Sequence, residues 1–125
     1  MSTVGEFEHK GHTILSVTYT GMSKEDALVE VAELSSVIRA SEPNSRLILS
    51  DFTDVHYDKA TSDKFAEFAK GNKPFVKASA VIGMTGMKRV LFNTAMKIAK
   101  RDIRNFDTRD AALSWLIDQA TNKEG

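Results

Sequence analysis

The sequence predicts a mixed α/β fold with a mostly parallel sheet, and three observations support this. Short apolar runs alternate with longer amphipathic segments along most of the chain, which is typical of strand–helix–strand units. The joints between segments are short, so successive parallel strands should be connected by right-handed crossovers. The first two strands meet around Lys10-Gly11, which favours an antiparallel hairpin at one edge. The expected order is ββαβαβαβα, with four helices.

Two strands and a helix are predicted first. Residues 3–9 and 12–20 have the composition of strands, and three alternating residues of the second strand share one face (Leu15, Val17 and Tyr19). Ser23 is a suitable helix N-cap, with Asp26 three positions later. Apolar residues recur at helical spacing as far as Ile38, and Pro43-Asn44 end this helix.

The remaining chain repeats strand and helix three times. Leu47-Ile48-Leu49 is a continuous apolar run, as expected for a strand covered on both faces. Residues 58–70 and 87–101 are predicted helices on either side of a strand at 76–84, where small alanines leave room for a closely packed helix. Residues 103–106 form a short last strand, and Asp107 is the expected cap of the final helix.

Composition indicates one globular domain covering residues 1–125. The chain is 42% hydrophobic and 27% charged, which is ordinary for a folded protein. It contains no cysteine, which rules out disulfides, thiolate metal sites and a cysteine nucleophile. Neither a signal peptide nor an apolar run of about 20 residues is visible. We therefore expect a soluble, cytoplasmic protein without a transmembrane segment.

Charge is distributed unevenly although the formal net charge is zero. Residues 1–69 hold 12 acids and 6 bases, a net of −6, whereas residues 70–125 hold 5 acids and 11 bases, a net of +6. Asp102 is the only acid between residues 70 and 104. The basic half could attract an acidic partner, an anionic ligand or a lipid headgroup, unless folding interleaves the two halves and the field cancels.

Several segments resemble the STAS family, the anti-sigma-factor-antagonist fold. Residues 47–55, LILSDFTDV, are similar to its third strand and following turn. The joint GMTGMK at 83–88 and the closing segment FDTRDAALSWL at 106–116 resemble a bacterial offshoot that relates STAS domains to CRAL-TRIO lipid carriers. The resemblance implies a mixed sheet of four to five strands in a single STAS-like domain, and a regulatory or ligand-sensing role.

The glycine-flanked joint before the third helix is the first candidate site. Free amides at a helix N-terminus can bind an anion, and glycines let the backbone approach it closely. The spacing matches neither a dinucleotide-binding motif nor a P-loop, and a tight turn with Thr85 as N-cap explains the segment equally well. The predicted ligand or anion site comprises Gly83, Thr85, Gly86, Lys88 and Arg89.

The third helix is the second candidate, because its apolar surface is wider than one sheet contact requires. Basic residues border that surface, so the helix could dock on an anionic membrane, a lipid or another subunit. A helix wedged between the sheet and a neighbouring helix is the alternative. The predicted interaction surface comprises Phe92, Met96, Lys97, Lys100 and Arg101.

A phosphorylation switch is the third candidate. Phosphorylatable STAS domains carry a modified serine at the helix that follows the third strand, and the matching segment here is YDKATS at 57–62. It lacks the family's turn, so Thr61 or Ser62 could substitute only if the helix starts late. Ordinary first-turn helix residues are the alternative.

Metal binding and catalysis have little support in the sequence. His56 lies among acids, but the spacing of an EF-hand and a second helical histidine are both missing. The sequence also has no nucleophile elbow, so we predict no metal, no cofactor, no nucleic-acid partner and no enzyme activity. The leading reading is a regulatory protein-interaction domain, with a protein partner or a homodimer. The alternative is a carrier or sensor of a small amphipathic or anionic ligand, with a cavity lined by Phe65, Phe68, Phe92 and Met96.

Overall fold

A computed structural model describes residues 2–121 and confirms the mixed α/β class and the order ββαβαβαβα. The sheet contains β1 (Gly5–His9), β2 (His12–Thr18), β3 (Arg46–Asp51), β4 (Val76–Ile82) and β5 (Ile103–Phe106). The helices are α1 (Lys24–Arg39), α2 (Lys59–Asn72), α3 (Gly86–Ile98) and α4 (Arg109–Thr121). A short 3-10 helix, η1 (Lys73–Phe75), leads into β4.

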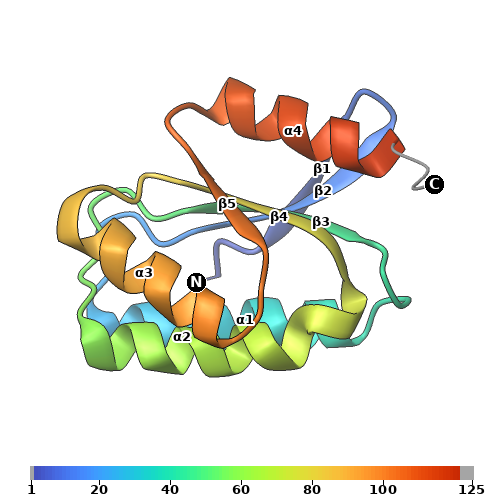
Figure 1. Ribbon diagram of the computed structural model, residues 1–125. Coiled ribbons are helices and arrows are strands. Elements are labelled where there is room, and N and C mark those ends of the chain that lie inside the picture. Colours follow the sequence, from blue (N-terminus) through green and yellow to red (C-terminus); the bar gives the residue numbers. More distant parts are fainter. Residues whose placement is uncertain (1, 122–125) are drawn as a thin grey trace.

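The five strands lie side by side in chain order, β1-β2-β3-β4-β5. β1 pairs with β2 antiparallel, and every later pair is parallel. Right-handed crossovers that all step in one direction place their helices on the same face of a sheet. Accordingly α1, α2 and α3 cover one face, and α4 crosses the other (Figure 1).

Side chains that alternate along the strands divide the interior into two layers. Ile48 of β3 faces α1, α2 and α3, whereas its neighbours Leu47 and Leu49 face α4. The larger layer contains five aromatic rings in mutual contact, with centroid separations of 4.6 to 6.1 Å between contacting pairs. These rings belong to Tyr19, Phe52, Tyr57, Phe65 and Phe92.

The helices differ from their predicted bounds by one to three residues, most of all at the end of α3. α3 ends at Ile98 and not at Arg101, because the chain turns there and Lys100 takes a left-handed conformation with φ of +59°. α4 begins at Arg109, and the hydroxyl of Thr108 accepts a hydrogen bond from the amide of Ala111 at 3.1 Å. Thr108 therefore caps this helix, and the prediction of Asp107 was wrong by one residue.

Candidate functional site

The predicted anion site begins where β3 and β4 end at the same edge of the sheet. Gly83 has φ of +85°, and a Cβ there would lie 2.4 Å from the amide nitrogen of Thr53. The amide and the hydroxyl of Thr53 both donate to one carboxylate oxygen of Asp51, at 2.9 and 2.6 Å. Because Gly83 has no side chain, the β3–α2 loop can lie directly against the end of β4. Asp51 adds a negative charge next to that loop, which disfavours an anion there.

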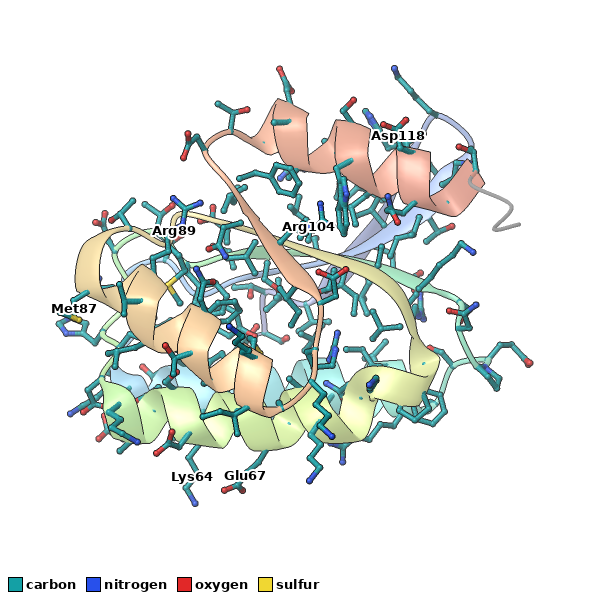
Figure 2. All side chains as sticks on the ribbon, in the orientation of Figure 1. Lys64, Glu67, Met87, Arg89, Arg104 and Asp118 are labelled. Carbon is teal, nitrogen blue, oxygen red and sulfur yellow. The ribbon has the colours of Figure 1, made fainter. Side chains whose placement is uncertain are left out.

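The rest of the joint is built mainly for structure. Thr85 occupies the N-cap position of α3, but its side chain makes no capping hydrogen bond. The ammonium of Lys88 donates to the backbone carbonyl of Val55 at 2.7 Å, so it holds the β3–α2 loop with one of its three N–H donors. Gly86 takes φ of +58°, and a Cβ there would meet nothing within 4 Å. Arg89 lies on the opposite side of the first turn of α3 from Met87 (Figure 2). The anion site, with Lys88 included, stays a prediction.

The start of α2 does not meet the condition for a phosphorylation switch. Asp58 is the N-cap, and its carboxylate accepts hydrogen bonds from the amide of Thr61 at 2.9 Å and from the hydroxyl of Thr61 at 2.7 Å. Hydrogen bonds from Thr61 and then from the ammonium of Lys24 lower the pKa of Asp58 to about 2. The helix therefore starts early, and Thr61 and Ser62 are both buried, at 3% and 1% exposure.

Ser62 instead joins α2 to α3, a role that the sequence analysis missed. Its hydroxyl accepts a hydrogen bond from Tyr57 at 2.8 Å and donates one to the carbonyl of Leu91 at 3.1 Å. Burial raises the pKa of Tyr57 well above its ordinary value, so this hydroxyl keeps its proton to donate. A serine at a core-facing position of an amphipathic helix was the available signal.

The predicted interaction surface on α3 was wrong in two of its residues. Phe92 and Met96 are 2% and 3% exposed, because they face the sheet in the larger core layer. Lys97 and Lys100 are exposed as expected. Arg101 is half-buried, and its guanidinium donates to the carbonyl of Ala69 at 2.6 Å.

Other apolar side chains of α3 do reach solvent. Met87, Val90 and Ile98, which we call the α3 stripe, are 70%, 56% and 78% exposed. Their spacing of three and eight residues places them within roughly 80° of arc on the helix. A shallow groove between α2 and α3 runs beside Ile98, with Glu67 and Lys70 on its α2 wall. The helix α3 therefore does expose apolar groups to solvent, but they belong to residues other than those predicted.

An internal cavity of about 50 Å³ lies between the sheet and the helices α1, α2 and α3. Three of the four side chains predicted to line a cavity do so, namely Phe65, Phe92 and Met96, whereas Phe68 packs outside it. The lining also contains buried polar groups that the sequence analysis did not single out. These are Tyr19, Ser50, Asn72 and Ser79, and the half-buried Arg101, which was predicted as part of the α3 surface, lines the cavity with them.

The described residues offer no further chemical cluster. Among residues 2–121, no three histidine or acidic side chains lie close enough together to hold a metal ion. His56 is exposed on its loop. None of the described helices is long and apolar enough to span a bilayer.

Comparison with known proteins supports the fold. No protein-family model matches the chain, and no curated protein matches it. Among solved structures, it is similar to an uncharacterised protein of the DUF3478 family with a SpoIIAA-like fold from Shewanella loihica PV-4. The two share 17% sequence identity with a TM-score of 0.68, over 90% of this chain and 91% of that one. The chain therefore has a SpoIIAA-like fold, the STAS-like architecture that its sequence resembles.

Proposed function

We propose that this protein is a non-catalytic regulatory module, a single STAS-like domain that binds a protein partner through α3. The α3 stripe carries the proposal, because three large apolar side chains on one helix face are more than 50% exposed. Exposed apolar groups that gather on one face are typical of protein-binding surfaces. Burying them against a partner would contribute about 1 to 2 kcal/mol for each side chain.

Charge beside the stripe indicates the chemistry of the partner. Lys97 is two turns from Val90 along α3 and close to it in angle around the helix axis. Lys100 follows the C-terminal end of α3, and both lysines are exposed. Neither lysine forms an ion pair with another described residue. A matching partner would offer apolar side chains to the stripe and carboxylates to these two lysines. The absence of cysteine fits action in the cytoplasm, where thiols stay reduced.

The test compares three variants in quantitative affinity purification from the source cells. Val90→Gln with Ile98→Gln should remove the bound partner, and Lys97→Glu with Lys100→Glu should weaken its binding. Val29→Gln is the matched control, because Val29 is an equally exposed apolar residue on α1, at 68%. If all three variants retain the same partner, α3 is not the binding surface. Sedimentation of the same variants shows whether the partner is a second copy of this chain.

The internal cavity favours a second candidate, a carrier or sensor of a small amphipathic ligand. Aromatic walls and buried polar groups line it together, as in ligand pockets. Its volume of about 50 Å³ admits only a small molecule, unless α2 and α3 separate. Native mass spectrometry of freshly purified protein would show a stoichiometric adduct for a carrier. A clean mass that no added ligand changes would count against this function.

A further inference from the structure

The large apolar side chains that are exposed in the described part of the chain all lie on two helices of one layer. Val29 of α1 is 68% exposed, and the others form the α3 stripe. Val29 points away from the core, because Val31 and Ile38 on the other side of α1 are buried. The strands follow one another in order, so α2 lies between α1 and α3 and packs against both. The outer surface of this layer therefore has two apolar points, one on each side of α2.

Acidic side chains surround Val29. Glu25 and Glu33 lie one turn before it and one turn after it on the same face of α1, and Asp26 lies beside them. All three acids are exposed, and none of the ion pairs among the described residues includes them. We call Val29 with these three acids the α1 patch. It is an apolar centre bordered by carboxylates.

The α3 stripe has the opposite charge beside it. Lys97 is exposed and close in angle to Val90, and the sequence of α3 contains no acid. The division of the chain into an acidic first half and a basic second half therefore persists on the outer surface of this layer. The α1 patch and the α3 stripe are complementary in charge, and both have apolar side chains at their centre.

The two surfaces also match in their positions along the helices. Both helices start at the same edge of the sheet, because each follows the carboxyl end of a parallel strand. At 1.5 Å per residue, Val29 and Val90 lie within about 2 Å of the same height, and Glu33 and Lys97 within about 3 Å. A two-fold axis along α2 exchanges the sides of α1 and α3 and preserves these heights. Such an axis would place each α1 patch on the α3 stripe of a second copy.

We propose that two copies of this chain form a symmetric dimer, in which the α1 patch of each copy binds the α3 stripe of the other. The proposal rests on the proposed function and deepens it, because it names a second copy as the partner of α3. Val29 of one copy packs against Val90 and Ile98 of the other, and Glu33 pairs with Lys97. Both contacts form in one dimer, so the assembly closes at two copies and does not grow into a filament.

A charge exchange tests the contact by sedimentation equilibrium of the full chain at low ionic strength, where screening is weak. Lys97→Glu and Glu33→Lys should each weaken dimerisation about tenfold, because each places like charges opposite one another in both contacts. The two changes together restore the pairing in the reverse direction, and the affinity should return to within about twofold of the native value. Asp118→Lys is the control, because Asp118 is exposed on α4 at the opposite face of the sheet (Figure 2).

Val29→Gln separates this proposal from the function on which it rests. A different protein bound to α3 alone stays bound to this variant, whereas a second copy should bind about tenfold more weakly. All the substituted side chains are exposed, so the variants should keep the native fold. A native chain that sediments as a monomer, or a charge exchange that does not restore the dimer, would overturn the proposal. If the α3 variants still lose a purified partner, the proposed function stands, and if they retain it, both fail.

Discussion

Arg39, Lys88 and Arg101 each donate to a backbone carbonyl of a neighbouring element. Lys88 bonds to Val55, Arg101 bonds to Ala69, and Arg39 bonds to the carbonyl of Phe68 at 3.2 Å. A long cationic side chain can connect two elements in this way while its stem covers apolar surface. These side chains hold the helices and loops in place, and each keeps its positive charge because the carbonyl that accepts its hydrogen bond is neutral.

Gly83 and Gly86 stand three residues apart and respond differently to the same change. Gly83→Ala should lower the free energy of unfolding by about 3 kcal/mol or more, because a left-handed alanine would also clash with the backbone of Thr53. Gly86→Ala is the matched control and should cost only about 1 kcal/mol, since nothing lies within 4 Å of its added methyl. Urea denaturation of both variants measures the difference. Equal losses would show that Thr53 moves aside easily.

Asp58 should make stability depend on pH at the acid end. Its pKa in the folded protein is about 2, below the ordinary 3.8, so the unfolded chain binds the proton more tightly. The stabilisation from its charge is complete above about pH 4 and is lost as the pH falls toward 2. Asp58→Asn keeps a capping oxygen but cannot titrate. The difference in urea midpoint between the native protein and Asp58→Asn should therefore narrow as the pH falls from about 4 to 2. A difference that stays constant would contradict the low pKa of Asp58.

Among the elements, α3 is held by a narrow buried face that includes Phe92 and Met96, and by specific hydrogen bonds to its neighbours. Ser62 and Lys88 tie its middle and its first turn to other segments, while Met87, Val90 and Ile98 remain outside the core. The sequence predicted the existence of this helix from its periodicity. Its orientation was not predictable, because apolar residues surround most of it and periodicity alone cannot choose the buried side.

Ser62→Ala should loosen the contact between α2 and α3. It removes the hydrogen bond to Leu91 and leaves the buried Tyr57 hydroxyl without its partner, at a cost of about 1 to 3 kcal/mol. Ser36→Ala is the control, because Ser36 is exposed on α1 and its hydroxyl bonds only to its own helix at 3.3 Å. That change should stay within about 0.5 kcal/mol. Equal effects in chemical denaturation would show that the link through Ser62 contributes little.

For the molecule as a whole, the element order and the mostly parallel sheet could be predicted, and the cavity only in part. Alternating strands and helices with short joints predict a parallel sheet with an added hairpin, which the structure confirms. The sequential order of the strands was not predictable, because other strand orders satisfy the same rules. Phe65, Phe92 and Met96 were predicted to line a cavity, but the polar residues beside them were not. Ser50, Ser79 and Arg101 come from three separate segments, and only the folded chain brings them to one place.

The sequential strand order also has a consequence for how the chain folds as it is made. Each new parallel strand pairs with the one synthesised before it, so the sheet can grow in step with translation from β1 to β5. The face lined by Ile14, Leu47 and Leu49 has no cover until α4 arrives, because α4 follows all five strands along the chain. A ribosome that stops before α4 would release a finished sheet with one bare apolar side. Such a surface is prone to aggregation, and a chaperone would have to shield it.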